Sequence, residues 1–391
     1  MRMKLFEKGL PERAVLRKLE SELKEDFTYD SGRILGSMCT SPHEFARHVY
    51  MKSLEKNLGD PGLFCAATQL EREAIGMLGS LLSHPNAYGH IVSGGTEANI
   101  LALWAARNLA KNRQREVLVP VSAHCSFDKA ANLLGLKLIK VKLNDRFQMN
   151  IKEAEKAVTE NTVAIVGVAG TTGLGVVDPV NELSEIALDH DIFLHIDAAF
   201  GGFVLPFLEE LGSNVPDFDF GVPGVCSVTV DPHKMGLAPI PAGGILFRNE
   251  EMMRSISTNV PYLAGGGTDH TTILGTRSGA SAVAVWGLLM HLGRQGYRGV
   301  VGRCMRLTSK LVEGIRRING VNLKTRPTLN IVGITSNEFD IELVAEELRR
   351  MGWAVSLFPS YIRVVIMPHV EPSHIQYFLQ DLKETVEKLR G

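Results

Sequence analysis

From residue 116 onward, short apolar runs alternate with stretches whose apolar residues recur at helical spacing. The runs predict strands at 116–120, 138–141, 162–167 and 192–196, and the stretches between them predict helices at 127–134, 151–158 and 180–189. Several of the strands are apolar throughout, which is typical of strands buried on both faces. The pattern therefore predicts an α/β fold with a mostly parallel sheet covered by helices on both sides.

The two ends of the chain have a different sequence pattern. Residues 1 to about 60 combine a charged amphipathic helix with a glycine- and serine-rich stretch. A long apolar helix is predicted at 280–292, and the remaining elements suit a small α/β domain. These elements are strands at 331–335, near 355 and at 362–366, and helices at 341–351 and 373–389. We expect an N-terminal arm (1–60), a large domain (61–295) and a small C-terminal domain (296–391).

Composition narrows the class of protein. The 391 residues include 42 Lys and Arg against 43 Asp and Glu, and the basic residues form no blocks, so we expect neither a nucleic acid nor a membrane partner. Five widely spaced cysteines without a C-x-x-C pair predict reduced thiols rather than disulfides or a metal site. The start of the chain lacks the apolar core of a signal peptide, which favours a cytoplasmic protein.

Lys234 is the first candidate for chemistry, because it is the only lysine between Lys156 and Lys310. It lies in Asp-Pro-His-Lys, where a β-branched apolar run gives way to a turn. A lysine desolvated there would have a lowered pKa and a free amine able to attack a carbonyl. The alternative is an ordinary lysine on an exposed loop.

Ser93-Gly94-Gly95-Thr96 falls between a short predicted strand and a long predicted helix. Backbone amides at such a glycine turn can bind an anion at the helix N-terminus, and Thr96 can add a hydroxyl donor. The alternative is that Thr96 only caps the helix. The motif matches neither G-x-G-x-x-G nor the P-loop pattern, which disfavours a dinucleotide-binding dehydrogenase.

Asp197 and His124 follow two other predicted strands. A carboxylate at the end of a buried strand needs a cation or donors, so Asp197 faces either Arg248 or a cation from outside the chain, such as a protonated heterocycle. The small residues Ala198, Ala199, Gly201 and Gly202 leave room for a flat group. His124 would lie at the carboxyl edge of the sheet, where open α/β folds bind ligands, although an isolated histidine there also suits a hydrogen-bonded loop.

Five motifs in this order resemble the group II pyridoxal-phosphate-dependent amino-acid decarboxylases of fold type I. They are Ser-Gly-Gly-Thr-Glu-Ala-Asn (93–99), Ser-Ala-His (122–124), Gly-Thr-Thr-Gly (170–173), His-Ile-Asp-Ala-Ala-Phe-Gly-Gly (195–202) and Asp-Pro-His-Lys (231–234). The likeness covers about residues 40 to 370. Within the family the chain is most similar to the short archaeal L-aspartate/L-tyrosine decarboxylases, through Asn57–Phe64, Pro261-Tyr-Leu and Ile273–Gly279.

The resemblance implies pyridoxal 5'-phosphate as the cofactor and assigns roles around its ring. Lys234 would bond to the cofactor aldehyde until the substrate amine displaces it. Asp197 would keep the ring nitrogen protonated, and His124 would stack on the ring. Thr172 would lie near Asp197, and Ala199 would press on the ring.

The resemblance also implies a phosphate site and a homodimer with shared active sites. Gly95, Thr96 and His233 would bind the phosphate, with Gly275 and Thr276 reaching it from the neighbouring subunit. Tyr262, also from the neighbour, would return a proton to Cα, and the glycines after it suit a mobile lid. Arg363 would anchor a substrate carboxylate unless it forms a structural ion pair, and His43 would lie near the substrate side chain.

The resemblance favours decarboxylation of L-aspartate to β-alanine, a precursor of coenzyme A. L-Tyrosine giving tyramine is the close alternative, and L-glutamate is the third. Within the cofactor class, another lyase or an aminotransferase competes with the decarboxylase. A noncatalytic oligomer that kept the fold as a binding module is the hypothesis from a different class.

Overall fold

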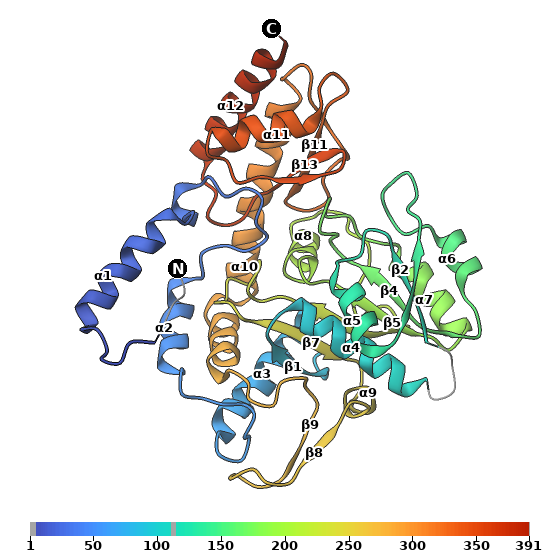
Figure 1. Ribbon diagram of the computed structural model, residues 1–391. Coiled ribbons are helices and arrows are strands. Elements are labelled where there is room, and N and C mark those ends of the chain that lie inside the picture. The colour runs from blue at the N-terminus through green and yellow to red at the C-terminus, as the bar shows by residue number, and fades with distance from the viewer. Residues whose placement is uncertain (1–4, 111–114, 391) are drawn as a thin grey trace.

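The computed structural model describes residues 5–110 and 115–390, and its larger sheet has seven strands in the order β1-β7-β6-β5-β4-β2-β3 (Figure 1). The strands are β1 Tyr88–Val92, β2 Glu116–Pro120, β3 Lys137–Val141, β4 Thr162–Val168, β5 Phe193–Asp197, β6 Val225–Val230 and β7 Gly243–Phe247. Pairing is parallel from β3 through β6, and β7 is antiparallel to both β6 and β1. The predicted mostly parallel sheet is confirmed, and β7 is a strand that the sequence pattern did not reveal.

Helices cover both faces of this sheet (Figure 1). They are α3 Cys65–Leu81, α4 Gly95–Leu109, α5 Ser126–Leu134, α6 Ile151–Ala157, α7 Val180–Asp189, α8 Leu205–Glu210 and α9 Glu250–Arg254. Successive residues of β2 enter different cores, because Val117 and Val119 pack in the cluster with α4 and α5, whereas Leu118 packs in the cluster on the other face. Burial on both faces explains why the central strands are apolar throughout.

Helix α10, Gly279–Ile315, leads from the large sheet to the second sheet. Its backbone breaks from helical geometry at Gly293, where φ is 53°, so the predicted helix at 280–292 is only its first segment. The second sheet comprises β10 Asn322–Leu323, β11 Ile331–Thr335, β12 Ser356–Phe358 and β13 Tyr361–Val365, packed with α11 Ile341–Arg350 and α12 Pro372–Arg390. Residue 295 lies within α10, and the domain limits at 60 and 295 stay predictions.

The N-terminal stretch contains α1 Glu12–Glu22 and α2 Glu44–Lys52. Helix α1 stands away from the large sheet in Figure 1 and buries none of its residues, whereas α2 packs beside α10. Two short strands, β8 Thr258–Val260 and β9 Thr268–His270, pair as a hairpin at the lower edge of Figure 1. The first four residues of the predicted arm lie outside the described part of the chain. In residues 5–110 and 115–390, no helix has the length and apolarity needed to cross a bilayer.

Asp178 closes the turn that follows β4. Its Oδ1 accepts a hydrogen bond from the Met149 amide (2.7 Å) and its Oδ2 accepts one from the Val168 amide (2.9 Å). The side chain is fully buried, and burial raises the pKa of Asp178 to about 6 despite both bonds. One side chain thus holds together the two ends of a loop that contributes to the cavity described below.

We expect Asp178→Asn to lower the free energy of unfolding by about 1–3 kcal/mol, because the new amide nitrogen must face one of the two N–H donors and leave it unpaired. Urea unfolding at pH 7.5, where the carboxylate is ionised, measures the change. Asp145→Asn, the same change at an exposed position, is the matched control. A loss no larger than that of the control would contradict this account.

Candidate active site

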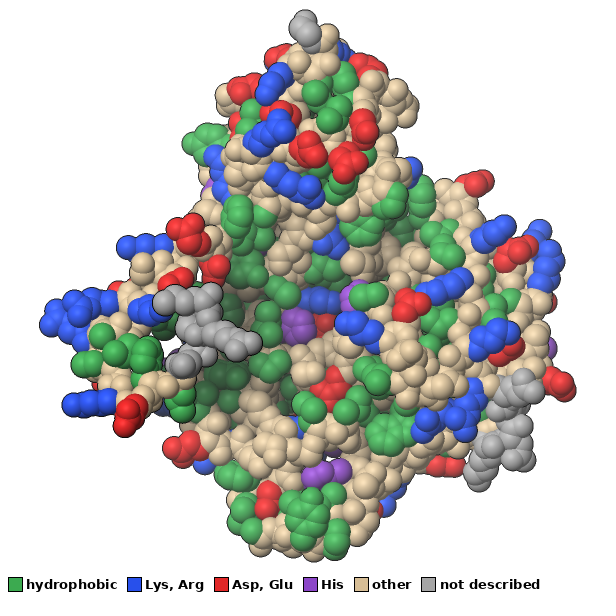
Figure 2. All heavy atoms as spheres, viewed as in Figure 1, with side chains coloured by type: hydrophobic (Ala, Val, Ile, Leu, Met, Phe, Trp, Pro, Cys, Tyr) green, Lys and Arg blue, Asp and Glu red, His purple; other side chains and the backbone are tan. Residues whose placement is uncertain are grey.

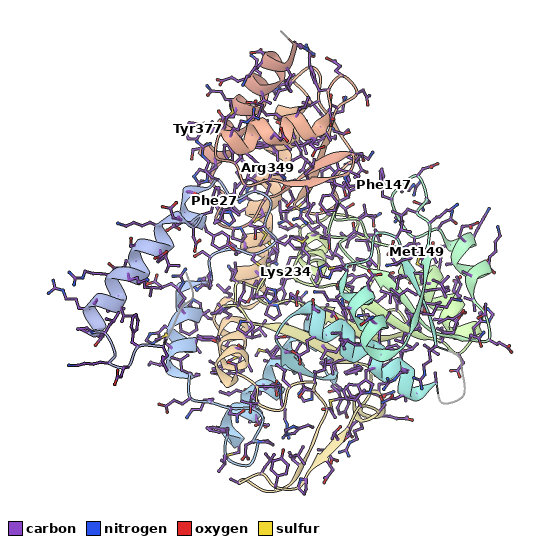
Figure 3. All side chains as sticks on the ribbon, in the orientation of Figure 1. Phe27, Phe147, Met149, Lys234, Arg349 and Tyr377 are labelled. Carbon is purple, nitrogen blue, oxygen red and sulfur yellow. The ribbon has the colours of Figure 1, made fainter. Side chains whose placement is uncertain are left out.

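A cavity of about 370 Å³ opens where the parallel strands β4, β5 and β6 end, as expected for ligand sites in open α/β sheets. Figure 2 shows charged and histidine side chains together in the hollow of this face, and Figure 3 labels Lys234 within the same region. Eight predicted site residues line the cavity: Gly95, Thr96, His124, Thr172, Asp197, Ala199, His233 and Lys234. Met38, Ser93, Asn99 and Asp231 also line it, and the sequence analysis assigned them no role.

Lys234 follows β6 through a tight turn in which its backbone amide donates to the Asp231 carbonyl. Its Nζ lies 2.9 Å from Asp231 Oδ2, and 19% of its side-chain surface is exposed. Burial disfavours the ammonium, but Asp231 and Asp197 together outweigh burial and raise the pKa of Lys234. The predicted lowering of its pKa is therefore wrong for the protein alone, since the two nearby carboxylates favour the charged form.

Asp197 ends β5 and is buried. Its Oδ1 accepts from the Ala199 amide (3.1 Å) and its Oδ2 accepts from Asn99 Nδ2 (3.0 Å). Arg248, the alternative structural partner, instead donates to backbone carbonyls at 220, 222 and 225. Neutral donors therefore make its hydrogen bonds, and no ion pair joins it to a cation within the described residues, although Lys234 lies near enough to interact with it. A cationic ligand can still approach this carboxylate directly.

A buried hydrogen-bond network fixes the orientation of Asn99 behind Asp197. Asn99 Oδ1 accepts from Thr229 Oγ1 (2.8 Å) and lies 3.0 Å from His195 Nε2, while Ser227 Oγ lies 2.8 Å from His195 Nδ1. Burial lowers the pKa of His195 to about 4, so its ring is neutral. Because Nε2 faces an amide oxygen, Nε2 carries the proton and Nδ1 accepts from the Ser227 hydroxyl. The network thereby directs the Asn99 amide nitrogen at Asp197.

His124 follows β2 and lines the same cavity. Its Nδ1 accepts a hydrogen bond from the Ser126 amide (3.2 Å). Burial lowers the pKa of His124, although Asp197 opposes the shift, so its ring presents a neutral flat face. Such a face is suited to stacking on an aromatic ligand.

The glycine turn ends at the N-terminus of α4, a helix of 15 residues. A Cβ on Gly95 would lie 2.9 Å from Asp231 Oδ2, so a larger residue would crowd the cavity. His233 Nδ1 donates to the Ala242 carbonyl (2.6 Å), which fixes the ring beside the turn. Backbone amides, the helix dipole and Thr96 together make this end of the cavity suitable for an anion.

Arg363 and His43 do not line the cavity. Arg363 is buried and donates to the Thr172 carbonyl (2.8 Å), to Ser356 Oγ (3.0 Å) and to the Gly36 carbonyl, and burial lowers its pKa. Its acceptors are all neutral, so it is not the structural ion pair of the alternative interpretation. His43 caps α2 by accepting from the Phe45 amide (3.2 Å).

Tyr262, Gly275 and Thr276 also lie outside the lining of the Lys234 cavity. Tyr262 is 83% exposed between β8 and β9, and Gly275 and Thr276 are exposed between β9 and α10. Gly275 borders a second cavity, of about 610 Å³. One copy of the chain therefore does not bring these three residues to Lys234.

The cavity residues fit a flat cationic ring that carries a carbonyl and an anionic group. A buried carboxylate held by neutral donors faces the cavity, and one end of the cavity is a helix N-terminus. Asp231 Oδ1 is buried without a hydrogen-bond partner among the described residues. In the same part of the chain, no group of three or more His, Cys, Asp or Glu is arranged to hold a metal ion.

The comparisons of this chain with known proteins agree with one another. Residues 51–334 match the family model described as the pyridoxal-dependent decarboxylase conserved domain. The L-aspartate decarboxylase of Thermococcus kodakarensis is 52% identical over 383 residues, which is 98% of this chain and 99% of that protein. A probable L-tyrosine/L-aspartate decarboxylase of Methanothermobacter thermautotrophicus is 53% identical over 358 residues (91% and 98%). The structure of a Burkholderia pseudomallei sphingosine-1-phosphate lyase aligns with a TM-score of 0.92 at 30% identity, covering 99% of this chain and 93% of that one.

We expect His195→Gln to change how stability depends on pH, because glutamine can make both hydrogen bonds but does not titrate. The unfolded chain takes up a proton at His195 near pH 6.5, whereas the folded protein resists it until about pH 4. The stability gained from neutral His195 is therefore complete above pH 6.5 and is lost as the pH falls toward 4. The difference in unfolding free energy between wild type and variant should shrink from pH 7 to pH 4.5.

Urea titrations at several pH values measure this difference, and His48→Gln on the exposed face of α2 is the control. A wild-type advantage that stays constant across this range would show that His195 is not held neutral in the folded protein.

Proposed function

This chain belongs to the pyridoxal-dependent decarboxylases, and from that membership we propose that it converts L-aspartate into β-alanine and carbon dioxide. It is a carboxy-lyase that acts on an amino acid with pyridoxal 5'-phosphate as its cofactor. The observation that carries the proposal is the convergence of Lys234, Asp197 and the glycine turn on one cavity. The preference for aspartate draws on the 52% identity to the Thermococcus L-aspartate decarboxylase.

The residues around the cavity have complementary roles. Pyridoxal phosphate, when bound, supplies an aldehyde for the substrate amine and a protonated ring that withdraws electrons from Cα. Lys234 would hold that aldehyde in the absence of substrate, and Asp231, 2.9 Å from Nζ, can receive the proton that the ammonium must lose. Asp197 would hold the proton on the ring nitrogen. His124 and Ala199 would contact the ring.

The phosphate and the substrate carboxylate bind at separate points. Gly95 and Thr96 bind the phosphate through the N-terminus of α4, with His233 beside them. Arg363, a buried cation with only neutral acceptors, supplies the charge for a substrate carboxylate, and Thr172 links it to the cavity through its carbonyl.

Two copies of the chain complete each site. Tyr262 is exposed and lies outside the cavity of its own chain, so it returns the proton to Cα in the neighbouring subunit's site. Gly275 and Thr276 likewise reach the neighbour's phosphate. Helix α1 supports a dimer, because Leu16, Leu19 and other apolar residues on it are about half exposed in a single chain.

We place the enzyme in the cytoplasm, where β-alanine serves as a precursor of coenzyme A. The five cysteines are free thiols, as expected for a reducing compartment. L-Tyrosine is the second candidate substrate, because the Methanothermobacter relative is named for both tyrosine and aspartate. If tyrosine is the substrate, His43 lies near its side chain.

Amine release by the cofactor-loaded protein tests the proposal, with L-aspartate, L-glutamate and L-tyrosine supplied separately. We expect β-alanine to be the dominant product and Lys234→Ala to abolish its formation, because that variant lacks the amine that bonds to the aldehyde. Tyramine as the dominant product would overturn the substrate, and a keto acid in place of an amine would indicate an aminotransferase. No turnover of any of the three would favour the noncatalytic binding module.

A further inference from the structure

The loop between β9 and α10 has an exposed apex and a buried base. Residues 273–276 are exposed, and a Cβ on Gly275 would have no atom within 4 Å. On either side of the apex, Thr271 is buried and the Arg277 side chain is only 9% exposed. Surface loops are ordinarily mobile, whereas the buried base of this loop restrains its exposed apex.

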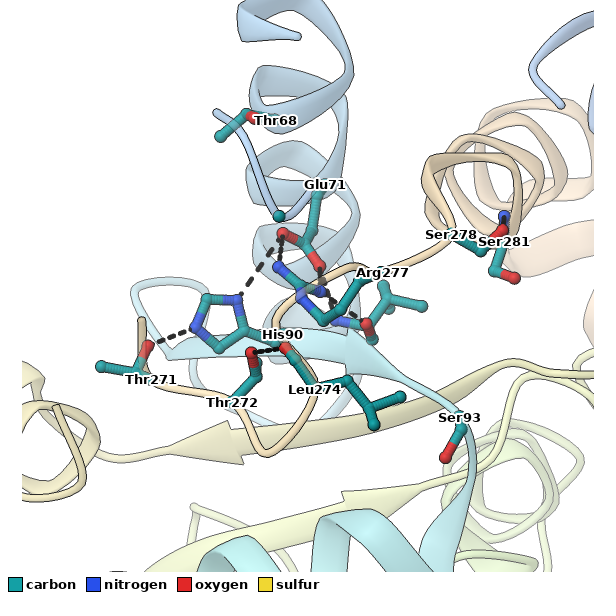
Figure 4. Close-up of polar contacts among 12 residues, drawn as sticks. Thr68, Glu71, His90, Ser93, Thr271, Thr272, Leu274, Arg277, Ser278 and Ser281 are labelled. Atoms are coloured by element: carbon teal, nitrogen blue, oxygen red, sulfur yellow. Dashed lines mark hydrogen bonds and ion pairs between the residues drawn. The ribbon is translucent and has the colours of Figure 1, made fainter. Parts of the chain in front are cut away.

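Arg277 forms a bidentate ion pair with Glu71 of α3 (Figure 4). Arg277 Nη1 lies 2.6 Å from Glu71 Oε1, and Nη2 lies 3.1 Å from Oε2. Arg277 Nη1 also donates to the Ile91 carbonyl (2.8 Å), while the Ile91 amide donates to Glu71 Oε1 (2.9 Å). Arg277 and Glu71 are therefore bonded to the backbone of β1 as well as to each other.

His90 extends the cluster to the other side of the apex (Figure 4). Its Nε2 lies 2.6 Å from Thr271 Oγ1, and its Nδ1 lies 3.6 Å from Glu71 Oε2. Glu71 thus faces both Arg277, just after the apex, and the histidine that holds Thr271, just before it. Arg277 is therefore bonded to Glu71, and Thr271 is bonded to a histidine that lies beside the same carboxylate on α3.

The charged side chains of this cluster interact strongly, because burial keeps solvent from screening them. Burial opposes ionisation of Glu71, but Arg277 and His90 outweigh it and hold the pKa of Glu71 far below its ordinary value. A buried ion pair of this kind adds little net stability over packed apolar residues, because the desolvation cost is large. What it does provide is one defined geometry, through two parallel hydrogen bonds.

The backbone of the loop is held in the same region by residues 56–59. The Arg277 amide donates to Asn57 Oδ1 (3.2 Å), and the Leu58 amide donates to the Arg277 carbonyl (3.0 Å). A Cβ on Gly59 would lie 2.1 Å from the Gly275 carbonyl oxygen, so the two segments approach as closely as glycine allows. Backbone contacts and side-chain contacts therefore both hold the base of the loop in place.

We propose that Glu71, His90 and Arg277 are positioning residues that present the apex, residues 273–276, to the cofactor phosphate of a second copy of the chain. This inference rests on the proposed function, in which Gly275 and Thr276 complete the neighbour's site. Glu71, His90 and Arg277 line the second cavity and not the cavity of Lys234. It acts on the neighbour's site by fixing where the apex lies relative to β1.

Cofactor affinity is the first test. Thr271→Val keeps the buried volume but removes the hydrogen bond to His90, and we expect pyridoxal phosphate to bind the dimer about 5- to 10-fold more weakly. Thr68→Val is the matched control, because Thr68 Oγ1 donates to the carbonyl of Phe64, the residue that caps α3, and not to the cluster. Unchanged affinity in Thr271→Val, or an equal loss in the control, would overturn the proposal.

Hybrid dimers show in which subunit the cluster acts. In a dimer of one Lys234→Ala chain and one Arg277→Met chain, the only site with an intact lysine receives its apex from the chain with intact Arg277. We expect that site to release amine at limiting cofactor with half the activity of the wild-type dimer, although each homodimer is impaired. If Arg277→Met does not fold, Thr271→Val takes its place.

A second hybrid, of Lys234→Ala with Tyr262→Phe, separates failure of the inference from failure of the proposed function. Suppose that the Tyr262→Phe hybrid regains activity and the Arg277→Met hybrid does not. The cluster would then act within its own chain, through Ile91 and the following glycine turn. That result would overturn the inference alone. If neither hybrid regains activity, the sites are not shared, and the inference fails together with the shared-site part of the proposed function, while amine release by the wild type still tests the activity.

Discussion

The charge on Asp197, which no ion pair within the described residues neutralises, is the constraint on which the site depends. A carboxylate out of water needs a cation nearby, yet Asp197 is held by an amide side chain and a backbone N–H. Asp231, the other carboxylate that lines the cavity, has Lys234 at 2.9 Å. A protonated heterocyclic ring therefore meets the need that the chain leaves open, and the neutral His195 behind Asn99 keeps the carboxylate directed at it.

The fold supplies this arrangement through the ends of its parallel strands. Strands β4, β5 and β6 end side by side, so the turns after them bring Thr172, Asp197 and Lys234 into one crevice. Helices pack against both faces of the sheet around these strands. Tyr262 is exposed, and neither it nor the loop that contains Arg277 lines the cavity of its own chain.

Periodic features of the chain were predictable, and tertiary features were not. The central strands and helices were found because burial on both faces leaves apolar runs. Strand β7 begins with Gly243-Gly244 and lacked that signal, and the glycine-rich part of α10 was taken for its end. The motifs located eight cavity residues, but the raised pKa of Lys234 depends on the tight turn that brings Asp231, three residues earlier, to its Nζ and on Asp197 from another strand. Glu71 and Arg277 are 206 residues apart, so no local pattern links them.

The claim that this crevice holds the cofactor through Lys234 is tested most directly by reducing the pyridoxal-phosphate-loaded protein with borohydride and mapping the labelled peptide. Reduction makes the bond between the cofactor and its lysine permanent, so the label reports where the aldehyde was attached. The account predicts a single labelled peptide that contains Lys234. A label on any other lysine, or no label on a protein that has bound the cofactor, would contradict it.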